Sequence, residues 1–418
     1  MKKPLHKHIS HNARKIHGHF TKYLYERDTI LATVWVFIFI FGLSLIPLNL
    51  GILNPLKLGL KDFDFNDIYY SKAKNEDSVR IDNRITIINI GSADREGIAY
   101  ILDKVASFNP KVMGLDALFS GPRDAAKDSI LRETINRNKN LVIAVKFELD
   151  SASKFMAAGN YFKTDSAKFG YVNFPYEGDK ETIRTYYPFK KDTHTQTTFS
   201  SFSSAIVKLY DSEAYHKIES KGDKGVLINY TRRFNDKYKK YYVVDDILNS
   251  EPDSSLINGK IVLLAYVNDN PTDIEDKKFT PMNEKYAGKS WPDMNGIIVH
   301  ANIISMVLDK SYIKKLPSWG NFLIAVVVCW LFMSFFIRYY LESHIWFHLV
   351  AKIVQVLSAF LFIWAGIAIF EKYHTKVDLK LSIIVIVMAV DVIYFYEAWA
   401  VWMHKKFNYK TVFKPHHH

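Results

Sequence analysis

Polar side chains that could bind a small molecule follow several short apolar runs in the middle of the sequence. Each run has the composition of a buried strand, and acidic, hydroxyl or imidazole groups come at its end or soon after it. In a parallel α/β sheet the loops after the strands meet at one edge, and ligands bind in the crevice at that edge. The candidate ligand-binding residues are Ser92, Asp94, Asp116, Phe119, Asp269, Asp276, Thr280 and His300.

A structural role is the alternative for these residues. A carboxylate such as Asp116 can satisfy backbone donors at the end of a strand. Thr280, which precedes Pro281, can shape a turn, and His300 can be a hydrogen-bonded residue of the core. The hypothesis of a ligand site therefore requires that Asp116, Thr280 and His300 converge on one concavity.

Motifs of the common enzyme classes are absent from the sequence. The chain has no P-loop, no GxSxG, no HExxH, no cluster of Cys and His, and no GxGxxG. Its single cysteine, Cys329, lies within an apolar run, so the rest of the chain has no disulfide. We therefore expect no catalytic activity, no cofactor and no bound metal.

Strands and helices alternate in the segment that carries the candidate residues. Short β-branched runs predict strands, and apolar residues at helical spacing predict helices. The predicted order is strand, helix, strand, helix, strand, over Ile85–Ile90, Arg95–Phe108, Val112–Phe119, Ala125–Asn136 and Leu141–Phe147. This order is typical of an α/β fold with a doubly wound, largely parallel sheet, and residues 169–174 and 183–189 predict an antiparallel extension.

Four apolar runs are long enough to cross about 30 Å of hydrocarbon as helices. They cover residues 29–50, 317–337, 345–370 and 381–402. The fold class is therefore α/β with four transmembrane helices added. These runs divide the chain into a tail at residues 1–28, a large domain at 51–316 and a second tail at 403–418.

The net charge of +12 is concentrated in the two tails, since residues 1–28 carry +5 and residues 403–418 carry +4. Short basic segments stay in the cytoplasm, and an even number of spans returns the chain to its starting side. We expect both termini in the cytoplasm and the domain at 51–316 in the periplasm or outside the cell, with the lipid bilayer as a partner. That domain has 39 basic and 36 acidic residues, so its charge does not favour nucleic acid as a partner.

Three charged residues, Lys352, Asp391 and Glu397, lie within the last two apolar runs together with Gln355, and an unpaired charge there costs roughly 2.5 to 3.5 kcal/mol at mid-depth. Counting about 1.5 Å per residue from the ends of the runs gives Lys352 and Glu397 similar depths, and puts Gln355 level with Asp391. These depths predict an ion pair between Lys352 and Glu397 and a hydrogen bond from Gln355 to Asp391. Alternatively, Lys352 extends to the cytoplasmic headgroups and Asp391 faces another subunit.

Four segments match a known family in order and spacing. They are NPKVMGLDALF at Asn109–Phe119, GKIVLLAYV at Gly259–Val267, FTP at Phe279–Pro281 and MNGIIVHAN at Met294–Asn302. With these segments the chain resembles, over about residues 60–315, the CHASE domain of the second type, a bacterial extracellular or periplasmic sensor domain followed by three transmembrane helices. The first strand departs from the family, because it ends in the residues 89–94 and not in the family's acid-bearing turn.

The resemblance implies a sensory protein of the bacterial inner membrane. Family members typically carry a histidine kinase or a cyclase after the last helix, whereas only about sixteen residues follow position 402 here. We therefore expect a receptor-like protein whose outer domain binds a ligand or partner and passes the signal to a separate membrane or cytoplasmic protein. A non-catalytic structural or assembly subunit of an inner-membrane complex is the alternative, and a homo-oligomer is compatible with both.

Overall fold

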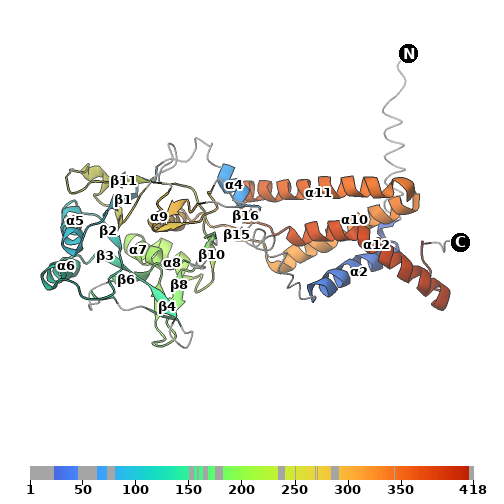
Figure 1. Ribbon diagram of the computed structural model, residues 1–418, viewed down its shortest axis with the longest axis horizontal. Coiled ribbons are helices and arrows are strands. Elements are labelled where there is room, and N and C mark those ends of the chain that lie inside the picture. Colours follow the sequence, from blue (N-terminus) through green and yellow to red (C-terminus); the bar gives the residue numbers. More distant parts are fainter. Residues whose placement is uncertain are drawn as a thin grey trace, which may run out of the picture. The chain divides into compact units, whose positions relative to one another are not determined.

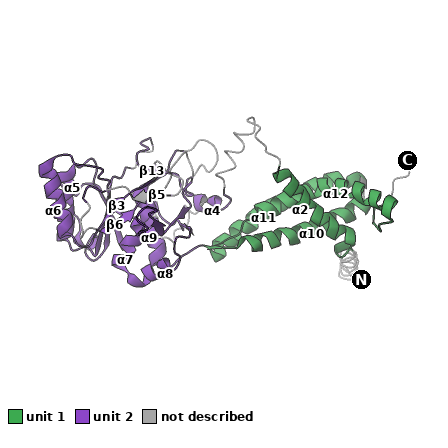
Figure 2. Ribbon diagram, turned by 90° about the horizontal axis from the view of Figure 1, so that it is seen from below, with its two compact units in different colours: residues 1–56, 314–418 green, residues 57–313 purple. Residues whose placement is uncertain are grey.

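The structure of the protein is a computed structural model that describes residues 23–45, 64–72, 81–149, 155–157, 160–162, 168–174, 182–233, 241–249, 251–268, 270, 272–283, 291–342 and 344–413. The chain forms two compact units, shown in Figure 2. Met1–Leu56 and Lys314–His418 form the membrane unit, and Lys57–Ile313 form the α/β domain. The candidate ligand residue Asp269 lies outside the described residues.

The membrane unit contains helices that are long and apolar enough to cross a membrane. They are α2 (Arg27–Ser44), α10 (Ser318–Glu342), α11 (His344–Tyr373) and α12 (Lys380–Phe407). The prediction of four such helices is confirmed. Buried side chains such as Val36, Phe336 and Ile393 join α2, α10 and α12 in one core, whereas only 11% of the most apolar stretch of α11 is buried.

A short pair of parallel strands ties two loops of the membrane unit together. β15 (Lys314–Lys315) precedes α10, and β16 (Thr375–Lys376) lies between α11 and α12. The backbone N–H of Lys314 donates to the carbonyl of His374 at 2.9 Å, and that of Leu316 donates to the carbonyl of Lys376 at 3.0 Å. The chain that enters α10 is therefore fastened to the loop that connects the last two helices.

The α/β domain is built on a six-stranded parallel sheet, and Figure 1 labels its strands β1, β2, β3, β6 and β11. Its strand order is β11-β1-β12-β2-β3-β6, and every neighbouring pair is parallel. The strands are β1 (Ile85–Asn89), β2 (Val112–Asp116), β3 (Leu141–Val145), β6 (Lys168–Tyr171), β11 (Tyr242–Val244) and β12 (Ile261–Ala265). The central strands are covered on both faces, which is why runs such as IVLLA in β12 are continuously apolar. The predicted α/β class and parallel sheet are confirmed.

Helices cover both faces of the sheet. Figure 1 shows α5 and α6 on one side of the strands and α7, α8 and α9 on the other. On the first side Leu102 of α5 and Leu131 of α6 pack with the strand residues Ile88 and Leu264. The helices are α4 (Asp67–Lys72), α5 (Arg95–Ser107), α6 (Ala125–Arg137), α7 (Phe202–Tyr210), α8 (Ser212–Glu219), the 3₁₀ helix η3 (Ser254–Leu256) and α9 (Gly296–Leu308). This two-sided cover is the doubly wound arrangement that the sequence predicts.

The antiparallel strands of the domain form separate two-stranded pairs. They are β4 (Phe147–Leu149) with β5 (Phe155–Ala157), β7 (Thr185–Tyr186) with β10 (Val226–Leu227), β8 (Phe189–Lys191) with β9 (Thr198–Ser200), and β13 (Lys277–Lys278) with β14 (Met294–Asn295). The predicted antiparallel direction of residues 169–174 is corrected, because β6 pairs with β3 in parallel. The segment with β4 and β5 lies between β3 and β6 and provides the crossover that parallel pairing needs.

Candidate functional site

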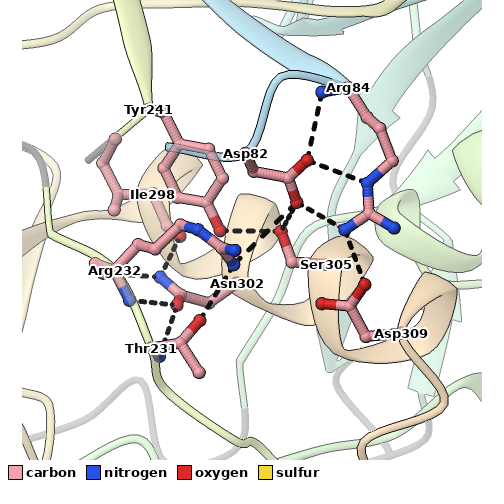
Figure 3. Close-up of polar contacts among 9 residues, drawn as sticks. All are labelled: Asp82, Arg84, Thr231, Arg232, Tyr241, Ile298, Asn302, Ser305 and Asp309. Carbon is pink, nitrogen blue, oxygen red and sulfur yellow. Dashed lines mark hydrogen bonds and ion pairs between the residues drawn. The ribbon is translucent and has the colours of Figure 1, made fainter. Parts of the chain in front are cut away.

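A buried polar network surrounds the second half of α9, as Figure 3 shows. The helix is largely apolar, but Asn302, Ser305 and Asp309 follow at spacings of three and four residues and so share one face. This face meets the segments before β1, after β10 and before β11. The other members of the network, which we call the α9 network, are Asp82, Arg84, Thr231, Arg232 and Tyr241.

Asn302 has no exposed surface and uses its full hydrogen-bonding capacity. Its Oδ1 accepts hydrogen bonds from the backbone N–H groups of Thr231 and Arg232, both at 3.0 Å. Its Nδ2 donates to the carbonyl oxygens of Arg232 at 3.0 Å and Ile298 at 2.9 Å. The side chain thus replaces a strand partner for residues 231–232 and fixes that segment to α9.

Asp82 is a buried carboxylate held by an arginine and a serine. Arg84 donates to it through Nε at 2.8 Å, Nη2 at 2.7 Å and its backbone N–H at 3.0 Å. The Ser305 hydroxyl donates to Asp82 at 2.7 Å, so it accepts from the Tyr241 hydroxyl, which is 2.9 Å away. Burial alone would raise the pKa of Asp82, but Arg84 and Ser305 outweigh it and lower that pKa to about 2. Asp82 is therefore charged throughout the physiological pH range.

The charges of the α9 network balance. Nη2 of Arg84 lies 2.8 Å from the carboxylate of Asp309, and Nη1 of Arg232 lies 3.9 Å from that of Asp82. Two acids therefore face two arginines. Because these groups bond to one another, the network is suited to hold four chain segments together and not to attack a substrate.

The first turn of α9 lies at the carboxyl ends of the strands, whereas the α9 network lies at their amino ends. Oδ1 of Asn295, the residue before the helix, accepts from the N–H of Asn268 at 3.3 Å, and its Nδ2 donates to the Asn268 carbonyl at 3.0 Å. Asn268 follows β12, so α9 starts at the carboxyl ends of the strands, where open α/β sheets bind ligands. The helix therefore extends from the predicted ligand edge to the α9 network.

His300 lies in the middle of α9 and is buried in the core. Its ring centroid is 4.6 Å from that of Phe174 and 5.3 Å from that of Phe202, and its Nδ1 is 3.0 Å from the Ser203 hydroxyl in α7. Burial lowers the pKa of His300 to about 3, so the ring is neutral at physiological pH. The residue joins α9 to α7, and its part in ligand binding stays a prediction.

Three predicted ligand residues lie at or near the start of α5. Ser92 and Asp94 are exposed, and Asp94 caps the helix and pairs with Lys127 of α6 at 2.5 Å. The buried ring of Phe119 lies 5.7 Å from the guanidinium carbon of Arg95. The structure thus brings Asp94 and Phe119 to the same corner of the domain, beside two basic side chains.

The remaining predicted ligand residues lie on three other segments. Asp116 ends β2 and is half-buried, and Asp276 is exposed at a left-handed position with φ of 55°. Thr280 is buried and donates to the carboxylate of Asp293 through its N–H at 2.8 Å and its hydroxyl at 2.6 Å. Burial of Asp293 outweighs these hydrogen bonds and raises its pKa to about 6. A common ligand concavity for Asp116, Thr280 and His300 stays a prediction.

Gln355 of the membrane unit does not bond to Asp391 as predicted. Its Nε2 donates to the carbonyl oxygens of Ile386 at 2.9 Å and Val387 at 2.8 Å in α12. Asp391 is exposed on α12. The predicted pair is wrong because the Gln355 amide donates its hydrogen bonds to backbone carbonyls of the neighbouring helix.

The predicted ion pair between Lys352 and Glu397 is wrong as well. Glu397 accepts a hydrogen bond from the Tyr340 hydroxyl at 2.6 Å, and Lys352 is exposed on α11. The predicted depths start from the ends of the apolar runs, but α12 continues to Phe407, five residues beyond its run. The true level of each residue follows from contacts between the helices and not from their ends.

Asp28, at the start of α2, forms a second buried network that the sequence does not reveal. Its carboxylate accepts from the hydroxyls of Tyr396 at 2.6 Å, Tyr409 at 3.0 Å and Thr411 at 3.0 Å, and from the N–H of Val412 at 2.6 Å. These partners lie up to 384 positions away in the sequence, so no local pattern predicts them. The carboxylate fastens the segment after α12 to the first helix.

A parallel α/β domain combined with four helices of membrane-spanning length defines the chain as a membrane protein with an α/β domain. The family model of the CHASE2 domain matches residues 36–336, and the chain belongs to the CHASE2 domain family. CHASE2 is a family of sensory domains, so the resemblance carried by the four sequence segments is confirmed. No curated protein and no solved structure matches the chain significantly.

Proposed function

We infer that the protein is a membrane sensor whose α/β domain binds a ligand or partner outside the cytoplasm and passes its state through the membrane helices to a separate protein. Membership of a sensory domain family supports the sensory role. The single observation that carries the proposal is the position of α9. This helix has its first turn at the edge where α/β sheets bind ligands and its last turns in the α9 network.

The route from α9 towards the membrane is short in sequence. Nine residues separate Leu308, the last residue of α9, from Ser318, the first of α10. Within them β15 pairs with β16, which lies between α11 and α12. A shift of α9 along its axis would therefore act on α10 through the chain and on α11 and α12 through these strands. Small shifts of a packed helix are a common way to change the state of a coupled element.

Both termini are expected in the cytoplasm, with the α/β domain on the other side of the membrane. In a Cys329→Ser background, a cysteine replacing the exposed Glu133 of α6 should react with a membrane-impermeant maleimide added to spheroplasts. A cysteine replacing the exposed Lys405 should react only after the membrane is lysed. The opposite pattern at either position would refute this topology and with it the site of sensing.

A reporter at the cytoplasmic end tests the transmission of the signal. A fluorophore on Lys405→Cys in nanodisc-embedded full-length protein is titrated with fractions of a periplasmic extract. We expect at least one fraction to change the emission, and the Ser305→Ala variant to abolish that change, since it removes the bond from α9 to Asp82. Ser220→Ala is the control, because its hydroxyl bonds within α8 and the turn that follows. An equal response of Ser305→Ala and wild type would contradict transmission through the α9 network.

A further inference from the structure

Two opposite charges lie exposed on the membrane-spanning part of the membrane unit. Lys352 of α11 and Asp391 of α12 are both exposed, and within the described part of the chain neither has an ion pair or a side-chain hydrogen bond. Apolar side chains with large exposed fractions flank them, among them Val356 at 55% and Val387 at 44%. A charge facing lipid costs roughly 2.5 to 3.5 kcal/mol at mid-depth, so this face requires partners for both residues.

The contacts between α11 and α12 show that the two charges lie at the same depth. The helices are antiparallel, and two contacts fix their register. His348 contacts Tyr394 with Nε2 3.0 Å from the hydroxyl, and Gln355 bonds to the carbonyls of Ile386 and Val387. Interpolation puts Lys352 level with position 390, one residue from Asp391. The difference in depth is about 1.5 Å.

The two charges also lie on the same side of the helix pair. Lys352 comes four residues after His348, and Asp391 comes three residues before Tyr394, so each is one turn from the contact between these rings. The buried positions Phe347 and Ala351 of α11, and Val390 and Ile393 of α12, define the inward side. Both helices are right-handed, and they run antiparallel. Lys352, four residues after His348, and Asp391, three residues before Tyr394, therefore both lie on the side of the helix pair that faces away from these buried positions.

We propose that this face joins two copies of the chain, with Lys352 of each copy paired to Asp391 of the other. A two-fold axis along the membrane normal keeps every residue at its depth, so reciprocal pairing needs two opposite charges at equal depth on one face. Lys352 and Asp391 meet this condition. The dimer forms two ion pairs shielded from lipid and covers the exposed side of α11, which the chain itself leaves mostly open. The inference does not depend on the proposed sensory function.

Charge exchange between copies tests the proposal. Lys352→Asp and Asp391→Lys are expressed together in full-length chains with different tags, and association is measured by copurification from lipid nanodiscs. Each variant alone should associate at least about tenfold less than wild type, because it places like charges opposite each other. The mixture should regain wild-type association, since both ion pairs re-form between unlike copies. An ion pair within each chain cannot be restored by mixing, because each chain then carries two like charges.

Cross-linking gives an independent readout of the same face. In a Cys329→Ser background, one copy carries Val356→Cys and the other Val387→Cys, two exposed positions level with each other. A disulfide between copies is expected. Leu357→Cys replaces Val356→Cys as the control: it is 63% exposed but two residues from Gln355, and so points away from α12. The proposal is overturned if wild type is monomeric in nanodiscs, if the charge-exchanged mixture stays apart, or if the Leu357 control cross-links as well as Val356.

Discussion

Replacing Asn302 by leucine is expected to destabilise the α/β domain by about 4 kcal/mol. The variant leaves the buried N–H groups of Thr231 and Arg232 without their acceptor, and each costs about 1 to 3 kcal/mol, while the added apolar contact offsets only part of the loss. The measurement is urea unfolding of the full-length protein in detergent, followed by hydrogen-peroxide oxidation of Met113, which is buried in β2. The midpoint should fall by more than about 1 M urea.

Ile303→Leu is the matched control for this variant. Ile303 is the next residue of α9 and is 1% exposed, but its side chain makes only apolar contacts. The exchange for leucine keeps the side-chain volume, so it should lower the free energy of unfolding by less than about 1.5 kcal/mol. Asp82→Asn gives a second test, because it removes the negative charge between Arg84 and Arg232. This variant should lower the free energy of unfolding by several kcal/mol. If Asn302→Leu unfolds at the same urea concentration as Ile303→Leu, the α9 network does not hold residues 231–232 in place.

The class of the fold could be predicted from the sequence, but not the order of its strands. The run of strand, helix, strand, helix, strand from Ile85 to Phe147 is local, and each element shows its own period. β12, however, lies between β1 and β2, and Leu263 pairs with Gly114 across 149 positions. No periodic pattern reports a partner at that distance. The alternation in residues 169–174 predicts an antiparallel strand, but the burial of β6 itself does not alternate, and the direction of this edge strand depends on the crossover before it.

The candidate site shows the same limit. The sequence prediction selected polar residues after strands, because ligands bind at that edge, and it therefore passed over the amino ends of the strands. Asp82 precedes β1, and its partner Ser305 is 223 positions away. One signal is local: Asn302 and Ser305 follow at helical spacing in an apolar segment, and polar groups on a buried helix face require partners.

The membrane helices show a limit of a different kind. Their existence is encoded in the length of each apolar run, which the bilayer dictates. Their relative register is encoded in single contacts, such as that of Gln355 with α12, which composition does not reveal. Depths counted from the helix ends are wrong by several residues. They pair Lys352 with Glu397, although Lys352 lies level with Asp391.

The pH dependence of the domain's stability is expected to combine two buried groups that act in opposite directions. The pKa of His300 is lowered from 6.5 to about 3, so the unfolded chain binds its proton first and stability is lost as the pH falls below 6.5. The pKa of Asp293 is raised from 3.8 to about 6, so the folded chain binds its proton first and stability is gained below pH 6. Between pH 7 and pH 5, His300 costs about 2 kcal/mol and Asp293 offsets about 1 kcal/mol.

Two variants separate these contributions, each read as the change in free energy of unfolding between pH 7 and pH 5 by the urea and Met113 oxidation assay. Asp293→Asn keeps an acceptor for Thr280 but cannot titrate, so this variant should lose about 2 kcal/mol on acidification. His300→Gln keeps a partner for Ser203 and should instead gain about 1 kcal/mol. Wild type should lose about 1 kcal/mol and so lie between the two, and the double variant should change less than either single variant, since both contributions are then absent. Because every other group titrates equally in all four proteins, parallel slopes for Asp293→Asn and His300→Gln would contradict the assignment to these two residues.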